Sequence, residues 1–329
     1  MRYYSMEQIY ISRRLPDEGL RKLQQYNLEI YEGDTPPSKE EIIRGIHGKD
    51  ALISLLTDPI DKEVIEASSQ LKIIANYAAG VDNIDISMAT RKGILVTNTP
   101  GVLTETTADL TWALILSIAR RIIQGDGIMR QRSFSGWAPK LLLGQDVHKK
   151  TLGIIGMGEI GRAVARRATG FDMSILYHNR TRDKRNEKKL NASFVDLETL
   201  LSNSDFITLH VPLTTETYHL IGKNEFKMMK KSAYLINTSR GKCVHEEALI
   251  QALSNGWIQG AALDVFEHEP HISSQLVELS NIVLAPHIGS ASHETRSKMA
   301  IMAAENVLAA FRGEIPPNCV NPDVVKKRV

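Results

Sequence analysis

The sequence has little of what marks a secreted, membrane-bound or nucleic-acid-binding protein. Its 329 residues include only two cysteines, Cys243 and Cys319, too few for a disulfide framework or a cysteine-rich metal site. Forty lysines and arginines face 38 aspartates and glutamates, and the net charge of +2 gives no field that would attract nucleic acid or an anionic membrane. The most apolar stretch, Trp112 to Ala119, is far shorter than the ~18 residues of a bilayer span. Met1 to Glu7 contain no apolar segment, so we expect no secretory signal and a cytoplasmic location. We also expect no bound metal.

Short apolar runs alternate with polar, helix-like stretches along most of the chain. This alternation is typical of parallel sheets that helices cover on both faces. The fold class predicted is therefore α/β, with two doubly wound parallel-sheet domains. The first sheet is expected from Gln8–Ile11, Leu28–Ile30, Ala51–Leu55, Leu71–Ala75 and Ile94–Thr97, and the second from Thr151–Ile155, Met173–Tyr177, Phe206–Leu209, Tyr234–Asn237, Gly260–Val265 and Ile282–Leu284.

Two further segments are predicted to be helices. Residues Thr104 to Ile123 are apolar on nearly every side, which indicates a buried helix, either packed inside a domain or held between domains or subunits. Residues Thr295 to Arg312 form an amphipathic pattern that Gly313 and Pro316 end. Because this segment follows the last strand of the second sheet, its helix could return to pack on the first domain.

The segment Gly156-Met157-Gly158-Glu159-Ile160-Gly161 has the pattern G-x-G-x-x-G. It follows the apolar strand that ends at Ile155 and opens a helix, which is the context that a dinucleotide-binding loop requires. Gly156 permits a tight turn, Gly158 allows the backbone to approach a pyrophosphate, and Gly161 allows the helix to pack closely on the strand.

The end of the next strand indicates which dinucleotide is preferred. An NAD site usually carries a carboxylate there to bind the ribose 2′-hydroxyl, and this chain has Asn179, Arg180 and Thr181 instead. These residues can donate hydrogen bonds to a 2′-phosphate, and an arginine fork suits a phosphate dianion well. We therefore expect NADP(H) to be preferred, with NAD(H) possible. The alternative is that Arg180 and Arg182 are only surface charges.

Three more polar segments follow strands of the second domain, where open α/β sheets bind ligands. They contribute Arg240, Glu269 and His287. A guanidinium can hold a carboxylate, an imidazolium can protonate a carbonyl oxygen, and a carboxylate can orient that imidazole, which together suit reduction of a keto acid. The nearby Glu267, His268 and His271 are expected to be solvated turn residues.

These motifs, in this order and spacing, resemble the D-isomer-specific 2-hydroxyacid dehydrogenase family. The resemblance rests on the glycine loop, Asn237-Thr-Ser-Arg-Gly241, Asp264-Val-Phe-Glu-His-Glu-Pro270 and Pro286-His-Ile-Gly-Ser290. The N-terminal half is similar to the glyoxylate/hydroxypyruvate reductase (2-ketogluconate reductase-like) branch, in Leu55-Leu-Thr-Asp58, Ala79-Gly-Val-Asp-Asn-Ile-Asp85 and Asn98 to Ala108.

The resemblance implies a catalytic set of Arg240, Glu269 and His287. It implies that the substrate carboxylate binds the backbone of Ala79, Gly80 and Val81, and that Arg240 and His287 also contact substrate. The cofactor-binding residues expected are Gly156, Gly158, Glu159, Ile160, Gly161, Asn179, Arg180, Thr181, Val211, Pro212, Thr238, Ser239, Asp264 and Gly289.

The resemblance also implies a discontinuous, flavodoxin-like substrate domain, residues 1–100 and 291–329. A Rossmann domain for NAD(P), residues 101–290, would be inserted in it, and the protein would be a homodimer with the active site in the interdomain cleft. Only 42 residues follow His287, which leaves no room for the regulatory domain of longer relatives.

The function expected is NADPH-dependent reduction of a small 2-keto acid, glyoxylate or hydroxypyruvate, to the D-2-hydroxy acid. One alternative is a reductase of 2-ketoaldonates such as 2-ketogluconate. A second alternative, from another class, is a corepressor-like protein that senses the dinucleotide without turnover.

Overall fold

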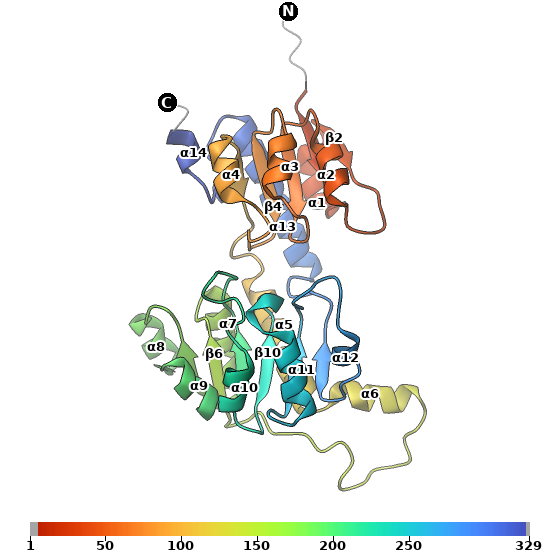
Figure 1. Cartoon of the computed structure of the whole chain (residues 1–329), viewed down its shortest axis with the longest axis vertical. Coiled ribbons are helices and arrows are strands. Elements are labelled where there is room, and N and C mark those ends of the chain that lie inside the picture. Colours follow the sequence, from red (N-terminus) through yellow and green to blue (C-terminus); the bar gives the residue numbers. More distant parts are fainter. Residues whose placement is uncertain (1–5, 327–329) are drawn as a thin grey trace, which may run out of the picture. The chain divides into compact units, whose positions relative to one another are not determined.

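The computed structural model describes residues 6–326, in which the strands form two separate parallel sheets. The described residues up to Leu103 and from Ser290 onward form one compact unit, called unit 1, and Thr104–Gly289 form unit 2. The predicted α/β class with two parallel sheets is confirmed (Figure 1). Residues 1–5, where the sequence predicts no secretory signal, lie outside the described part. Among the described helices, none is long and apolar enough to span a bilayer.

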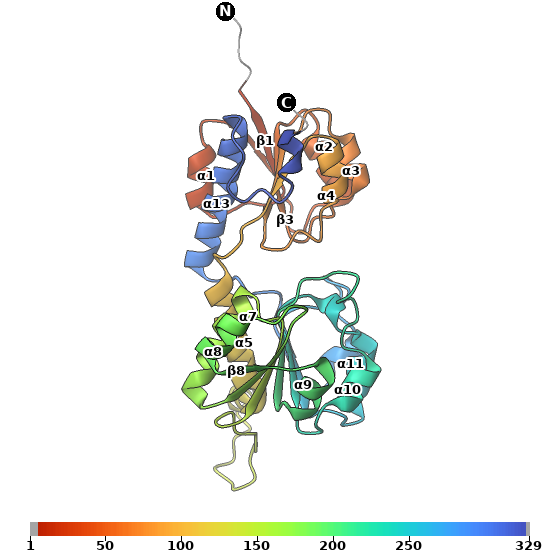
Figure 2. The ribbon, with the colours of Figure 1, turned by 90° about the vertical axis from the view of Figure 1, so that its left-hand side faces the viewer.

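Unit 1 contains a five-stranded sheet in the order β2-β1-β3-β4-β5, the flavodoxin-like order. Helices α1 and α13 lie on one face, and α2, α3 and α4 lie on the other (Figure 2). Helix α13 packs against α1 and β4, so the C-terminal helix returns to the first sheet as expected. The elements are β1 Gln8–Ile11, α1 Asp17–Leu23, β2 Asn27–Ile30, α2 Lys39–Ile46, β3 Ala51–Leu55, α3 Lys62–Ala67, β4 Ile73–Tyr77, α4 Ile86–Arg91, β5 Leu95–Thr97, α13 His293–Phe311 and α14 Asp323–Lys326.

Unit 2 contains a seven-stranded sheet in the order β12-β11-β10-β9-β6-β7-β8. The order reverses between β6 and β9, and ligands bind at such a switch point in doubly wound sheets. Helices α5, α7 and α8 lie on one face, and α9, α10 and α11 on the other (Figure 2). The elements are α5 Thr104–Ala119, α6 Ile122–Arg130, β6 Thr151–Ile155, α7 Glu159–Ala168, β7 Ser174–His178, α8 Lys184–Leu190, β8 Ala192–Phe194, α9 Leu197–Asn203, β9 Phe206–Leu209, α10 Lys223–Met228, β10 Tyr234–Asn237, α11 Glu246–Ser254, β11 Gly260–Leu263, α12 Ser274–Val277 and β12 Ile282–Leu284.

The structure corrects the predicted helix Thr104–Ile123, which ends at Ala119. The Ala119 carbonyl accepts a hydrogen bond from Gln145 N–H at 2.9 Å, and Arg121 takes the left-handed conformation with φ 54°. A separate helix, α6, then begins at Ile122. Helix α5 packs on α7 and against β10, β11 and β12, which buries one side of it inside unit 2, while Glu105, Asp109 and Ala113 are exposed.

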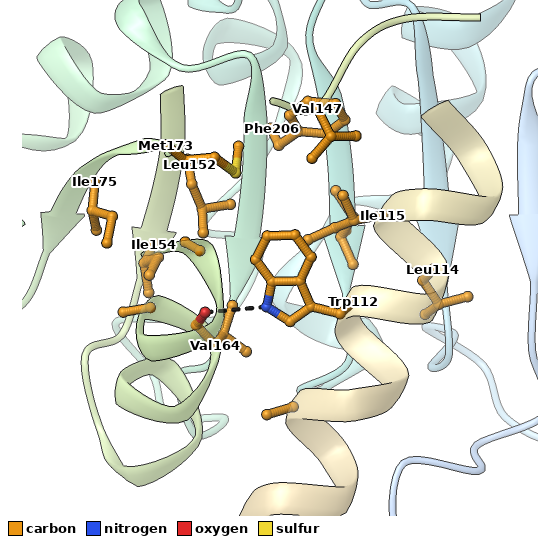
Figure 3. Packing of buried hydrophobic residues seen from close by; sticks show 14 of the residues in the cluster. Trp112, Leu114, Ile115, Val147, Leu152, Ile154, Val164, Met173, Ile175 and Phe206 are labelled. Carbon is orange, nitrogen blue, oxygen red and sulfur yellow. Dashed lines mark hydrogen bonds between the residues drawn. The ribbon is translucent and has the colours of Figure 1, made fainter. Parts of the chain in front are cut away.

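Trp112 lies in the layer between α5 and α7 (Figure 3). Its indole N–H donates to the Val164 carbonyl at 3.1 Å, and its ring stacks on Phe171 with centroids 4.7 Å apart. The side chain is 5% exposed. Because the polar edge is hydrogen-bonded and both the ring and its surroundings are apolar, Trp112 holds α5 against the dinucleotide-loop helix α7 at low desolvation cost.

Trp112→Ala should lower the free energy of unfolding of unit 2 by about 3–5 kcal/mol, because it leaves a cavity and removes the hydrogen bond to the Val164 carbonyl. All three tryptophans of the chain lie in unit 2, so urea unfolding followed by tryptophan fluorescence reports this unit. Val277→Ala, which truncates a side chain that is 58% exposed, is the control and should change stability by less than about 0.5 kcal/mol. Equal effects of the two variants would contradict the packing role.

Candidate active site

The three candidate catalytic residues come from adjacent strands of unit 2. Strands β10, β11 and β12 are parallel neighbours, so the segments that leave their carboxyl ends emerge at one edge of the sheet. Arg240 follows β10, Glu269 lies in the turn after β11, and His287 follows β12. The structure brings two of them into direct contact: His287 Nδ1 lies 2.8 Å from Glu269 Oε2, and each side chain is 26% exposed.

Glu269 is held in its ionised form at this position. Burial by itself would raise the pKa of the carboxyl, but the hydrogen bond and charge of His287 and the Phe266 N–H outweigh burial and lower it. The Arg240 guanidinium adds to this lowering of the Glu269 pKa, so its charge acts on the same carboxylate. Arg240 also donates from Nη1 to the Ser239 carbonyl at 2.8 Å. A guanidinium, a carboxylate and an imidazole thus form one electrostatic group.

Asp264 fixes the backbone that carries His287. Its two carboxylate oxygens accept from the N–H groups of Ile288 and Gly289, at 2.7 and 2.8 Å. Burial raises the Asp264 pKa, against the lowering effects of these two N–H groups and of the nearby His287. His287 has φ 54°, a left-handed conformation that non-glycine residues seldom adopt. The buried carboxylate therefore helps to hold a strained residue in place.

The glycine loop leaves the start of α7 open. Gly156 has φ 99°, and an added Cβ there would lie 2.5 Å from the His210 carbonyl oxygen. At Gly161 an added Cβ would lie 2.1 Å from the Gly156 carbonyl oxygen, so only glycine allows this approach of helix and strand. Gly158, the N-cap, has nothing within 4 Å of such an atom, and no side chain caps the helix. The helix start therefore fits an anionic group such as a pyrophosphate, bound by N–H groups that include those of Glu159 and Ile160.

The end of β7 contacts this loop through Asn179. Its side-chain oxygen accepts from the Met157 N–H at 2.7 Å, which leaves the amide nitrogen as the donor. Arg180 and Thr181 are exposed, and within residues 6–326 Arg180 forms no ion pair within 4 Å. Arg182 differs, because it binds both carboxylate oxygens of Glu187, at 2.7 and 2.9 Å.

The remaining candidate cofactor residues of unit 2 lie in two loops. An added Cβ at Gly156 would also lie 2.9 Å from Val211 Cγ1, so Val211 is next to the glycine loop. Pro212 follows Val211. Ser239 donates from N and Oγ to Asn237 Oδ1, and Thr238 Oγ1 lies 3.0 Å from Thr111 Oγ1. Thr238 and Ser239 are each 8% exposed, so these hydroxyls are structural partners as well as candidate ligands.

Ala79, Gly80 and Val81 belong to unit 1, in the loop that follows β4. Their three carbonyls accept from Asn98 Nδ2 at 2.7 Å, Asn76 Nδ2 at 2.9 Å and Ile84 N at 3.1 Å. Within the described residues their own N–H groups make no hydrogen bond. The loop is fixed through its carbonyls, and its N–H groups remain as donors for an anion.

The structure corrects one expectation and adds residues that the sequence did not indicate. His268 and His271 are exposed as expected, but the Glu267 side chain is only 9% exposed and lies 2.6 Å from His219 Nε2. Asn76 and Asn237 orient the loops described above, and the sequence alone assigned neither of them a role. A polar amide at the end of a buried strand is the signal that could have found them.

An anion-binding helix start at the switch point, and an imidazole–carboxylate pair at the carboxyl edge of the same sheet, are typical of nicotinamide dinucleotide oxidoreductases. The sequence matches the family described as "D-isomer specific 2-hydroxyacid dehydrogenase, NAD binding domain" over residues 112–289. The chain belongs to this family, as the resemblance predicted, and its enzyme class is that of NAD(P)-dependent 2-hydroxyacid dehydrogenases.

Individual relatives cover the chain almost completely. A glyoxylate reductase of Korarchaeum cryptofilum is 54% identical over 323 residues, which cover 97% of each chain. A Thermus thermophilus protein of known crystal structure has a TM-score of 0.90 and 44% identity, covering 95% of this chain and 99% of that one. The NADPH-dependent glyoxylate/hydroxypyruvate reductase of Sinorhizobium meliloti, solved with NADP and malonate, has a TM-score of 0.87 and 31% identity, covering 97% of this chain and 98% of that one.

Proposed function

We propose that the protein reduces a small 2-keto acid, glyoxylate or hydroxypyruvate, to the D-2-hydroxy acid with NADPH. The observation that carries this proposal is the 2.8 Å contact between His287 Nδ1 and Glu269 Oε2, beside the charge of Arg240. The names of the relatives, glyoxylate reductase and NADPH-dependent glyoxylate/hydroxypyruvate reductase, support the same substrate class. The 2-ketoaldonate reductase remains the alternative within this reaction type.

His287 acts as the proton donor in this proposal. Because Glu269 engages Nδ1, Nε2 is the ring nitrogen left to protonate the carbonyl oxygen of the substrate. The Glu269 carboxylate stabilises the imidazolium before the proton leaves, and Arg240 binds the substrate's carboxylate and carbonyl oxygens. A bound, reduced dinucleotide supplies the hydride. Unit 2 is thus the cofactor domain, while the N–H groups of residues 79–81 in unit 1 bind the substrate carboxylate.

His287→Asn should lower kcat for glyoxylate reduction by at least about 100-fold, because asparagine tolerates the left-handed backbone but donates no acidic proton. The measurement is NADPH consumption at 340 nm with saturating glyoxylate, together with NADPH binding by calorimetry, which should stay unchanged. His268→Asn, in an exposed residue of the same unit, is the control and should retain wild-type turnover. Retained turnover in His287→Asn would remove the proton-donor role, whereas tight NADPH binding by an inactive wild type would favour the dinucleotide sensor.

The preference for NADPH rests on the side chains at the end of β7. The Asn179 oxygen accepts from the Met157 N–H, which leaves the amide nitrogen free to donate to a phosphate. Arg180 is exposed, and within residues 6–326 no ion pair holds it, whereas Glu187 engages Arg182. A donor amide beside an accessible guanidinium suits a phosphate better than a ribose hydroxyl.

Arg180→Ala should raise the Kd of NADPH by about 10- to 100-fold, since a charge-assisted hydrogen bond contributes roughly 1.5–3 kcal/mol. The Kd of NADH should change by less than about threefold, because NADH carries no 2′-phosphate. Arg182→Ala is the matched control, and its effect on NADPH should be much smaller because Arg182 is already paired with Glu187. Fluorescence titration with both cofactors measures these values, and equal losses for NADPH and NADH would refute the assignment.

We also propose that the protein is a homodimer joined through the segment 122–143. Helix α6 has no buried residue, and this segment extends away from the sheet of unit 2 in both views (Figures 1 and 2). Several exposed apolar side chains in one segment are typical of an interface. The side chains and their exposed fractions are Ile122 54%, Ile123 54%, Met129 60%, Phe134 50%, Trp137 83%, Leu141 41% and Leu143 66%.

The cytoplasmic location of the protein stays a prediction.

Leu143→Asp combined with Ile123→Asp should convert the dimer to a monomer, because the charges would be buried without partners at the interface. Sedimentation equilibrium should give about twice the 36.7 kDa chain mass for the wild type and the single chain mass for the variant. Val277→Asp, on exposed α12, is the control and should remain dimeric. A monomeric wild type at micromolar concentration would contradict the proposal.

A further inference from the structure

Glu267 is buried in a second carboxylate–imidazole contact close to the candidate catalytic pair. Its Oε1 lies 2.6 Å from His219 Nε2, and its Oε2 accepts from the Glu246 N–H at 2.9 Å. In return, the Glu267 N–H donates to Glu246 Oε2 at 3.2 Å. Glu246 is 8% exposed. We call Glu267, His219 and Glu246 the clamp, because their contacts join three separate segments of unit 2.

The clamp joins the segments that follow β9, β10 and β11. His219 N–H donates to the Lys242 carbonyl at 2.8 Å, and Ile221 forms a parallel bridge with Val244, so the first two segments are hydrogen-bonded to each other. Glu246 then binds Glu267 in the third segment. Gly241, beside Arg240, lies directly against Phe266, since an added Cβ at Gly241 would be 1.9 Å from the Phe266 carbonyl carbon. The backbones of the segments carrying Arg240 and Glu269 are therefore in direct contact.

The third segment passes directly from the clamp to the reacting pair. Glu269 is two residues beyond Glu267, and its Oε1 accepts from the Phe266 N–H at 2.8 Å. This hydrogen bond turns Oε2 toward His287. A shift of Glu267 would displace Phe266 and with it the donor that orients Glu269. From these contacts we propose that Glu267 and His219 are positioning residues, which hold Glu269 within hydrogen-bonding distance of His287; this rests on the proposed function, in which His287 is the proton donor.

Packing alone gives no reason for this arrangement. The Glu246 and Glu267 side chains are almost fully buried and His219 is 25% exposed, and burying two carboxylates costs free energy that apolar side chains would not cost. His219 also adopts φ 51°, a second left-handed imidazole residue in the same unit as His287. Burial would raise the Glu267 pKa, but the Glu246 N–H and His219 outweigh it and hold the pKa below its usual value. Such strain and buried charge are typical of segments whose geometry serves a reaction.

Several titratable groups lie near the imidazoles of His219 and His287, and they contribute to any pH dependence of the activity. His219 is faced by Glu267, by the Tyr218 ring at 4.0 Å and by the His245 ring at 4.5 Å. Glu267 also senses the charge of His268. His287 is faced by Glu269 and Asp264, with Arg240 acting on Glu269. Within the described residues, the hydrogen bonds of the Glu267 side chain go to His219 and Glu246, and His287 contacts Glu269, so an effect of Glu267 on His287 has to pass through the position of Glu269.

The test compares Glu267→Gln, His219→Leu and His219→Gln with the wild type. Glu267→Gln keeps the shape but cannot accept both hydrogen bonds, so we expect kcat to fall about tenfold, in the range that small misplacements of reacting groups produce. The KM for glyoxylate should stay within twofold. The low-pH limb of kcat should move to higher pH, because Glu269 loses part of the His287 contact that lowers its pKa. His219→Leu should behave like Glu267→Gln, and His219→Gln, which can still donate to Glu267, should recover part of the loss. His271→Gln, an exposed residue of the same segment, is the control with wild-type values.

A second readout does not depend on turnover. The ring signals of His287, assigned in NMR spectra by their loss in His287→Asn, should differ in chemical shift between Glu267→Gln and the wild type, because the contact of Nδ1 with Glu269 changes. Unchanged kcat, pH limb and ring signals in Glu267→Gln would overturn the proposal, as would a loss of activity that follows lost thermal stability with no change in the ring signals. If the wild type reduces no 2-keto acid, the proposed function fails, and the ring signals alone then support or overturn the positioning role.

Discussion

The contact between His287 and Glu269 depends on the parallel pairing of β11 with β12, which aligns Leu263 with Leu284. Parallel neighbours release their next segments at the same edge of the sheet, so residues far apart in the sequence emerge side by side. Asp264, the first residue after β11, then binds the N–H groups of residues 288 and 289 and fixes the segment from β12 against its own. The end of β11 thus provides both Asp264, which fixes the backbone next to His287, and the turn that carries Glu269. Without this pairing, none of the acid–base chemistry has a defined geometry.

In both units, asparagine side chains at or near strand ends bind the backbone of loops at the carboxyl edge of the sheet. Asn76 binds the loop after β4, Asn179 binds the glycine loop, and Asn237 accepts from Ser239 while donating to the Arg240 carbonyl. An amide carries a donor and an acceptor without net charge, so it can fix a loop at low desolvation cost and leave the local charge to the reacting groups. Carboxylates are used where charge matters. Glu267 and Glu269, two residues apart, each bind an imidazole, His219 and His287.

The positions of the strands along the chain were predictable because buried parallel strands are nearly continuous apolar runs. Six of them, β1, β3, β6, β9, β10 and β12, have the predicted bounds. Strand β8 was missed, since its residues Ala192–Phe194 form a short edge strand with little apolar pattern. The helix through Ile123 was predicted too long because its end is set by Gln145, which binds the Ala119 carbonyl from 26 positions further along. Glu267 was assigned to solvent because E-H-E-P-H reads as a polar turn; only the approach of His219 and Glu246 buries it.

The sequence by itself determined the fold class, the family, and the residues whose chemistry suits hydride transfer to a keto acid, because apolar periodicity and short motifs are local properties of the chain. Tertiary structure alone decided which charges are used. It paired Arg182 with Glu187 and left Arg180 accessible, turned Glu269 toward His287, and buried Glu267 between two other segments. Arg182 and Glu187 are only five positions apart, but the other two contacts join residues 18 and 48 positions apart. Those longer distances are set by how parallel strands and their crossover helices pack, which no local pattern encodes.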